Sequence, residues 1–256
     1  MKAAAEASYG RKGEQVVAMN QAAIDQGFAA VRRVEVPAHW AQAAGEERDQ
    51  NSHHAGAEME RYLRDIQDPI AAQRGDSLPV SAFFGREDGA LPQGSAAFEK
   101  RGIAVDVSTW VPENCIQCNF CSYVCPHAII RPAVMSTQEL EAAPEGMEAV
   151  PMTGMPGLSF AVTISQLDCT GCGSCANVCP GKKGEKALVM RPLDSQREKQ
   201  PYFDYGQELS PKPEVLEKFK PTTVKGSQFR RPLLEFSGAC GGCGETPYAK
   251  LVTQLF

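Results

Sequence analysis

The sequence lacks any hydrophobic run that could cross a membrane, because no apolar stretch approaches the roughly 20 residues that a spanning helix needs. Its first 15 residues, MKAAAEASYGRKGEQ, contain neither an apolar stretch nor an export cleavage pattern. An excess of basic residues is also missing. The 26 Lys and Arg face 31 Asp and Glu, and the net charge of −5 argues against non-specific binding to nucleic acid. These absences predict a cytoplasmic protein with no membrane and no nucleic-acid partner.

Cysteine is what breaks an otherwise ordinary composition of 43% hydrophobic and 22% charged residues. There are ten cysteines, and eight of them fall between residues 115 and 179. Such a density would suit a disulfide scaffold in a short secreted chain, but these scaffolds are rare in a reducing compartment. Metal binding is therefore the better interpretation.

Two runs share the pattern Cys-x-x-Cys-x-x-Cys-x-x-x-Cys-Pro, one with Cys115, Cys118, Cys121 and Cys125 and one with Cys169, Cys172, Cys175 and Cys179. The pattern resembles the established signature of bacterial ferredoxins that carry two 4Fe-4S clusters. In that signature the fourth cysteine of each run ligates the other cluster. The resemblance therefore implies two crossed ligand sets, Cys115, Cys118, Cys121 and Cys179 for one cluster and Cys125, Cys169, Cys172 and Cys175 for the other.

The spacing also suits this chemistry, since cysteines two residues apart can wrap a tight loop whose backbone N–H groups point at the sulfurs. Structural zinc is the alternative metal, although it needs only two Cys-x-x-Cys pairs, or such pairs with His. His127 follows the first Cys-Pro, and we expect it to be a surface residue or a neighbour of the ligands, because the four-cysteine set is complete without it. Helical turns are expected after each Cys-Pro, where Pro suits the first turn of a helix.

Alternating β-branched segments flank both runs. GIAVDVSTW (102–110) precedes the first run, FAVTIS (160–165) precedes the second, and KALVMRPL (186–193) follows it as a returning strand. They predict a pseudo-symmetric β-α-β pair. The fold class is α+β, with a bacterial two-cluster 4Fe-4S ferredoxin-like domain flanked by linker segments and partial α/β domains. The Pro- and Gly-rich insertion over 142–157 either shields a cluster or is only a surface loop.

Helices are predicted over residues 14–33 and 59–70, where apolar residues recur on one face. Between them, VEVP is expected to form a short strand, and the polar connection over 45–58 contains His53 and His54, which we interpret as solvated. Residues 75–106 are expected to be an extended linker with a short strand or two, and 195–223 a connecting arm. The predicted divisions are the end of a preceding α/β domain (1–45), a linker region (46–106), the two-cluster domain (107–195), a connecting arm (196–232) and the start of a further domain (233–256).

Basic residues follow the second run at Lys182, Lys183, Lys186 and Arg191. They could dock an acidic redox partner, but a solvated face is the preferred interpretation. Further along, Cys240 and Cys243 form a Cys-x-x-Cys pair among four nearby glycines. Two cysteines cannot complete a 4Fe-4S site, and no βαβ pattern leads into the pair as a thioredoxin-like motif would require. The pair either needs two ligands from outside the chain or does something else.

QFRRPLLEFSGACGGCGETPYAKLVTQLF, which contains this pair, resembles the start of the thiamine-diphosphate-binding domain of pyruvate:ferredoxin oxidoreductases. LPVSAF and the segments around both cysteine runs are similar to the linker and the two-cluster domain of that family, and SYGRKGEQVVAMNQAAIDQGF resembles the end of its preceding domain. The resemblance covers nearly the whole chain. It implies that Cys240 and Cys243 are half of the ligands of a third 4Fe-4S cluster.

The Gly-Asp-Gly thiamine-binding segment of that family is absent from the sequence, and so are the domains that contact pyruvate. The resemblance therefore implies an internal segment, or one piece of a split enzyme, with a truncated thiamine domain and no catalytic residues of its own. The complete enzyme would bind thiamine diphosphate, form a homodimer, act under anaerobic conditions and pass electrons from a 2-oxoacid such as pyruvate to ferredoxin or flavodoxin. The alternative is a stand-alone ferredoxin-type carrier or electron-transfer subunit, although such a carrier has no need of GACGGCGETPY.

Overall fold

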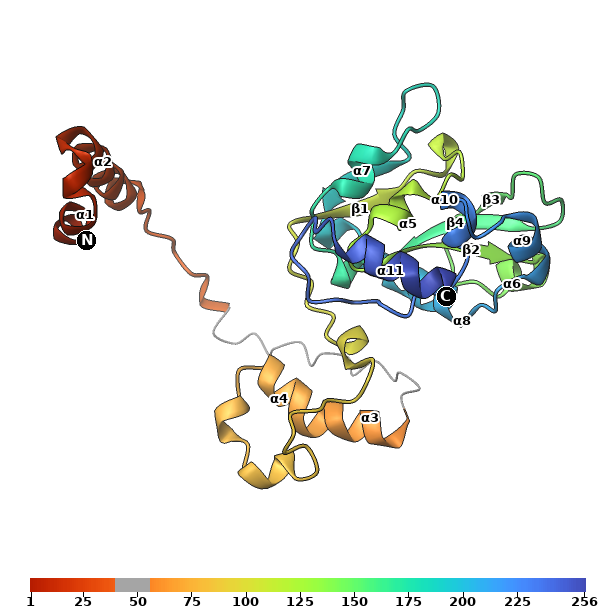
Figure 1. Cartoon of the computed structure of the whole chain (residues 1–256), viewed down its shortest axis with the longest axis horizontal. Helices are drawn as coiled ribbons and strands as arrows, with labels where there is room; N and C mark the ends of the chain where they lie inside the picture. The colour runs from red at the N-terminus through yellow and green to blue at the C-terminus, as the bar shows by residue number, and fades with distance from the viewer. Residues whose placement is uncertain (40–55) are drawn as a thin grey trace. The chain divides into compact units, whose positions relative to one another are not determined.

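A computed structural model describes residues 1–39 and 56–256, and the chain divides into two compact units, Met1–His54 and Ala55–Phe256. His53 and His54, predicted to be solvated, lie outside the described residues. The first unit contains α1 (Lys2–Tyr9) and α2 (Glu14–Ala30), and α2 confirms the helix predicted from the apolar periodicity (Figure 1). The strand expected at VEVP does not form, because residues 31–37 pair with no other segment.

A nearly continuous helix opens the described part of the second unit, built from α3 (Ala57–Tyr62), a π-helical turn (Leu63–Gln67) and α4 (Asp68–Ala71). This confirms the helix predicted around residues 59–70. The π-helical turn lies just before Pro69, whose ring removes a backbone donor. The segment that follows forms short 3-10 turns and no strand between residues 75 and 105, so the strand or two expected there is wrong. In the described parts of both units, no helix has the length and apolarity to cross a membrane.

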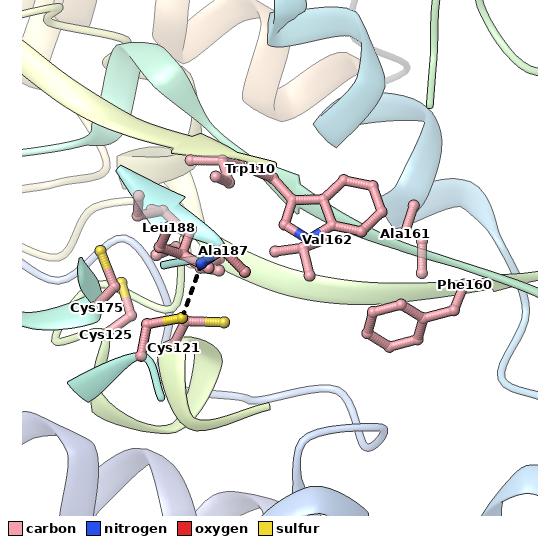
Figure 2. Packing of buried hydrophobic residues seen from close by; sticks show 14 of the residues in the cluster. Trp110, Cys121, Cys125, Phe160, Ala161, Val162, Cys175, Ala187 and Leu188 are labelled. Carbon is pink, nitrogen blue, oxygen red and sulfur yellow. Dashed lines mark hydrogen bonds between the residues drawn. The ribbon is translucent and has the colours of Figure 1, made fainter. Parts of the chain in front are cut away.

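Two small antiparallel sheets form the centre of the second unit. β1 (Asp106–Trp110) pairs with β5 (Leu188–Pro192), and β4 (Ser159–Ile164) lies between β2 (Ile130–Met135) and β3 (Val150–Pro151). Strands β1, β4 and β5 confirm the three that the alternating segments predict. The two sheets share one core, in which Trp110 of β1 packs edge-on against Phe160 of β4 at 6.4 Å between ring centroids (Figure 2).

Two short helices carry the third cysteine of each run, α5 (Phe120–Val124) and α7 (Ser174–Val178). Both end immediately before the Cys-Pro pair, so the expectation of helical turns after Cys-Pro is wrong. The physical reason is the effect of Pro on the residue before it, which is pushed out of the helical region. Cys125 and Cys179 accordingly adopt extended backbone angles, with ψ of 116° in both.

Several helices cover the sheets: α6 (Thr137–Glu141), α8 (Gln200–Glu208), α9 (Pro213–Lys218), α10 (Val224–Ser227) and α11 (Thr246–Leu255). The segment expected to be a connecting arm is therefore helical, and it is folded onto the domain rather than extended away from it. Helix α8 packs on β4 and β2 through Phe203, which is 1% exposed, and α9 buries Val215. Helix α11 lies beside α5 (Figure 1).

Candidate metal centre

The two cysteine loops have the same backbone geometry at equivalent positions. In each run, the residue two positions after the first cysteine has a positive φ: Gln117 at 58° and Gly171 at 71°. The N-cap residue of the following helix also has a positive φ: Asn119 at 63° and Gly173 at 73°. These left-handed turns curl each loop and aim backbone donors inward. The N–H of Gln117 donates to Cys115 Sγ at 3.4 Å, and the N–H of Gly171 donates to Cys169 Sγ at 3.5 Å.

Gln117 occupies a backbone conformation that costs non-glycine residues about 1 kcal/mol or more. Its side chain compensates, because its Nε2 donates to Pro151 O at 2.9 Å and its Oε1 accepts from the N–H of Thr153 at 2.8 Å. Pro151 and Thr153 belong to the Pro- and Gly-rich insertion, whose Met152 is buried in the core. The insertion therefore braces the first cysteine loop and is more than a surface loop.

Four cysteines line one cavity, three from the first run and one from the second. They are Cys115, Cys118, Cys121 and Cys179. Phe160, Val162 and Leu188 supply apolar walls. The N–H of Ala187 donates to Cys179 Sγ at 3.3 Å, the bond drawn in Figure 2.

A second cavity has the complementary set: Cys125, Cys169, Cys172 and Cys175. Figure 2 shows Cys125 of the first run next to Cys175 of the second. Ile129, Ile130 and Met190 complete the apolar lining. Each cavity therefore brings together three cysteines of one run and the fourth of the other, which is the grouping implied by the ferredoxin signature. That these cysteines ligate iron stays a prediction.

The donor sets suit a cluster better than a single ion. All ten cysteines are free thiols. Across the described part of the chain, no three His, Cys, Asp or Glu side chains converge closely enough to hold one metal ion. A tetrahedral zinc site would bring four sulfurs to about 2.3 Å from one centre, and no such convergence is present among the described residues. The thiols and the N–H donors aimed at them fit a 4Fe-4S cluster.

Burial controls the electrostatics of these thiols. It raises the pKa of Cys115, Cys121 and Cys169, and it raises the pKa of Cys175 to about 11. The indole of Trp110 acts in the opposite direction and partly offsets this rise in the pKa of Cys115. A metal that bound here would therefore have to displace protons from buried thiols, since only thiolates ligate metal.

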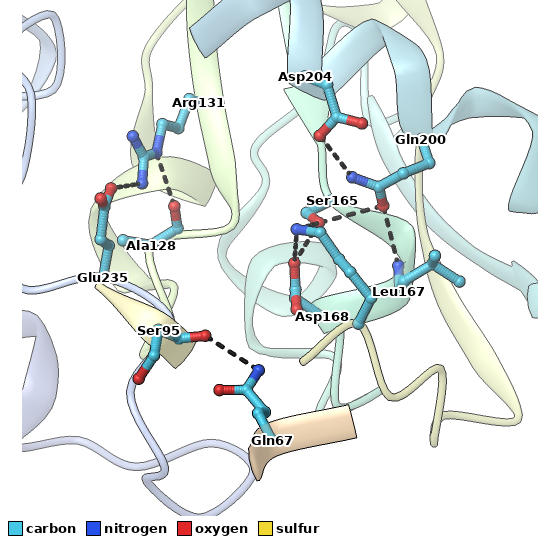
Figure 3. A network of polar contacts seen from close by, with 11 residues as sticks. Gln67, Ser95, Ala128, Arg131, Ser165, Leu167, Asp168, Gln200, Asp204 and Glu235 are labelled. Carbon is cyan, nitrogen blue, oxygen red and sulfur yellow. Dashed lines mark hydrogen bonds and ion pairs between the residues drawn. The ribbon is translucent and has the colours of Figure 1, made fainter. Parts of the chain in front are cut away.

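A polar network fixes the start of the second run. Asp168, directly before Cys169, pairs with Lys100 at 2.5 Å and accepts a hydrogen bond from Ser165 Oγ. Gln200 of α8 accepts hydrogen bonds from Ser165 Oγ and from the N–H of Leu167 (Figure 3). The helix that covers the sheet therefore also orients the entry to the second cysteine loop.

His127 connects the first run to the segment that precedes Cys240. It is 4% exposed, so the surface alternative for this residue is wrong. Its Nδ1 lies 2.9 Å from Ser237 O, its backbone carbonyl accepts from the N–H of Phe236 at 2.9 Å, and its Nε2 lies 3.4 Å from Thr170 Oγ1. His127 lines the second cavity without being needed as a ligand.

Cys240 and Cys243 lie outside both cavities, Cys240 exposed and Cys243 half-buried. The two glycines between them pack close to the second run, where a Cβ on Gly242 would lie 3.6 Å from Cys172 Cβ. Backbone N–H groups of Thr246 and Glu245, at the start of α11, lower the pKa of Cys243. The pair is therefore accessible and lies next to the second cavity.

Two buried cations that no sequence pattern indicates bind the C-terminal segment to the first run. Arg131 pairs with Glu235 and donates from Nε to Ala128 O at 2.8 Å (Figure 3). It also donates to Gln207. Lys250 of α11 is 1% exposed. An Arg inside a strand and a Lys inside an amphipathic helix resemble solvated residues unless their partners are known.

Comparison with known protein families assigns two segments of the chain separately. Residues 114–185 match a family described as a 4Fe-4S dicluster domain, and residues 48–104 match a domain of unknown function named EKR. The dicluster match spans both cysteine runs.

Curated relatives extend the match to the whole chain. The pyruvate-flavodoxin oxidoreductase of Klebsiella pneumoniae is 52% identical over all of this chain and 21% of its own length. The pyruvate:ferredoxin oxidoreductase of Moorella thermoacetica is 48% identical over 97% of the chain and 20% of its own length. The chain matches one segment of these pyruvate oxidoreductases. This confirms the resemblance seen in the sequence, and the chain spans about a fifth of the length of these relatives. The mitochondrial pyruvate dehydrogenase [NADP(+)] of Euglena gracilis contains a similar segment, 40% identical.

Proposed function

We propose that this chain binds two 4Fe-4S clusters and conducts electrons through them. The observation that carries the proposal is the pair of cavities, each lined by three cysteines of one run and the fourth of the other. When bound, such clusters accept and release one electron at a time. This chain supplies the thiolates, the N–H donors to sulfur and the apolar walls that exclude water.

The reaction belongs to a larger enzyme, a pyruvate (2-oxoacid):ferredoxin oxidoreductase. Its remainder would hold thiamine diphosphate, and electrons would leave for ferredoxin or flavodoxin. The printed names of the relatives support this, since they pair pyruvate with flavodoxin or ferredoxin. Cys240 and Cys243 would supply half of a third cluster site. Their position against Cys172 supports transfer into the second cavity first. We further propose a cytoplasmic, anaerobic homodimer as the complete form.

The divisions follow from this function. Residues 1–45 would end a preceding domain, 46–106 link it to the two-cluster domain at 107–195, 196–232 connect onward, and 233–256 begin the thiamine domain. In the second candidate function, the chain is a stand-alone ferredoxin-type carrier. The anchoring of the Cys240 segment by His127 favours the enzyme, since a free carrier has no use for a third, incomplete thiol pair.

The test is metal analysis of the chain purified without oxygen. We expect a brown protein with about eight irons and eight sulfides per chain, because two four-iron clusters fill the two complete sites. A colourless protein with near-stoichiometric zinc would overturn the proposal. To separate the two candidate functions, reduction of the protein by thiamine-dependent pyruvate turnover is measured with the chain inside the full-length enzyme. Cys240→Ser should abolish cluster reduction by pyruvate in the enzyme and leave the iron of the two sites in place. In a stand-alone carrier, Cys240→Ser would leave cluster reduction unchanged.

A further inference from the structure

Two lysines cap the two equivalent short helices of the cluster domain. On α7, Lys186 Nζ donates to Ala176 O at 2.8 Å and to Asn177 O at 2.9 Å. These carbonyls belong to the first and second residues after Cys175. Lys186 is exposed and comes from the chain just beyond the second run.

The matching carbonyls on α5 are those of the first and second residues after Cys121. They accept from Lys250, whose Nζ bonds Ser122 O and lies 3.0 Å from Tyr123 O. A third carbonyl, that of Cys125, lies 3.4 Å away. Lys250 is 1% exposed and comes from α11, more than 120 residues along the chain. The same cap is thus made locally on one helix and by a distant, buried lysine on the other.

The buried ammonium of Lys250 lacks a carboxylate partner among the described residues, because none of the ion pairs there includes it. Carbonyl dipoles at a helix C-terminus favour a cation, but burying an unpaired charge is costly. The carbonyls near its Nζ include those of Ser122, which follows Cys121, and of Cys125. Cys121 lines the first cavity and Cys125 the second. The negative charge that would compensate Lys250 is therefore divided between the two cluster sites.

We propose that Lys250 is a tuning residue that places one buried positive charge between the two cluster sites and raises the reduction potential of both. The inference rests on the proposed function, since it needs clusters in the two cavities. Reduction adds one negative charge to a cluster ligated by thiolates. A fixed positive charge nearby stabilises the reduced form more than the oxidised form, and the effect is strong where water is excluded.

Lys250 lies in the C-terminal segment, so its effect on the clusters depends on the docking of that segment. Helix α11 follows directly on the Cys240–Cys243 loop, so the charge reaches the clusters only when this C-terminal segment is docked. The potentials of the two clusters are therefore set by the same segment that would bring the third site to Cys172.

The experiment is a potentiometric titration of the anaerobically purified chain, followed by EPR of the reduced clusters, with iron counted in every sample. We expect Lys250→Met to lower both potentials. At a fixed potential, the ratio of reduced to oxidised cluster should fall about tenfold, which is 59 mV for a one-electron couple. Lys250→Arg keeps the charge and should stay close to the unmodified protein.

Lys186→Met is the matched control, since it removes the equivalent cap from α7. Because Lys186 is exposed, solvent screens its charge and we expect a much smaller shift. Equal potentials in the unmodified protein and in Lys250→Met would overturn the inference. So would loss of iron in both Lys250→Met and Lys250→Gln while Lys250→Arg loads normally, because Lys250 would then act only as a structural cap. If the unmodified chain itself holds no iron, the proposed function fails instead.

Discussion

The two cysteine loops share one backbone path but stabilise it in different ways. The second loop uses glycine at both left-handed positions, Gly171 and Gly173, and needs no side-chain support there. The first loop places Gln117 and Asn119 at the same positions and holds them with distant partners. Asn119 Nδ2, for example, donates to Lys225 O at 2.9 Å. The first loop is therefore stable only in the context of the folded remainder, whereas the second carries its geometry in its own backbone.

The helices that follow repeat this difference. Helix α7 receives its cap from Lys186, ten residues away at most, and α5 receives its cap from Lys250, across more than 120 residues. In these two features the first half of the domain uses more distant partners than the second half. The two halves therefore differ in how the features are held, and variants can separate them.

The largest effect should come from Cys125→Ser, which tests whether the halves exchange their fourth cysteine. Cys125 lies in the second cavity, so the variant should lose the cluster held by Cys169, Cys172 and Cys175, and with it about four irons. Iron analysis and EPR of the remaining cluster measure this. Cys179→Ser is the mirror variant and should empty the first cavity instead. Loss of the opposite cluster in either variant would disprove the crossed assignment.

A smaller effect should come from changing the residues at the left-handed positions of the two loops. In Gly171→Ala, the new Cβ would lie 2.8 Å from Asp106 O and φ would remain at 71°, so we expect a loss of about 2 kcal/mol or more in stability. Gln117→Gly removes two hydrogen bonds but also the backbone strain, and the net change should be within about 1 kcal/mol. The denaturant midpoint of the anaerobic protein measures both.

Gln117→Ala sharpens this test, because alanine keeps the strain and loses the hydrogen bonds to Pro151 and Thr153. We expect it to be less stable than Gln117→Gly. If glycine at this position proves worse than alanine, the left-handed backbone of the first loop is not what limits its stability.

The same difference explains how far the sequence could be interpreted. Strands β1, β4 and β5 follow from local alternation, and all three are present. The crossed cysteine grouping follows from the resemblance to the ferredoxin signature rather than from spacing alone. Strand β2 carries Arg131 and Pro132 in its middle, which hides the alternation. The two helices lie before each Cys-Pro pair rather than after it, because the left-handed turns at Asn119 and Gly173 start each helix early. Lys250 could not be found, since its partners are backbone carbonyls that no side-chain pattern reveals.

The smallest effect concerns α6, which lies in the connection between the two runs. Ser136 and Glu139 form a capping box at its start, and Lys212 pairs with Glu139 Oε1 at 2.5 Å. Burial raises the pKa of Glu139, but the hydrogen bonds from Lys212 and Ser136 outweigh it and hold this pKa below its usual value. Glu139→Gln should therefore cost about 0.5–1 kcal/mol near pH 7.

The sign of the pH dependence follows from the lowered pKa. The contribution of Glu139 is complete above the pKa of the unfolded state, about 4.3 for Glu, and it is lost as the pH falls through the lower folded value. The stability difference between the unmodified protein and Glu139→Gln should therefore be full at about pH 6 and shrink below about pH 4. Denaturant unfolding of both proteins at each pH measures it, and the other titrating groups cancel in the difference. A difference that grows on acidification would mean that the carboxylate destabilises the folded domain.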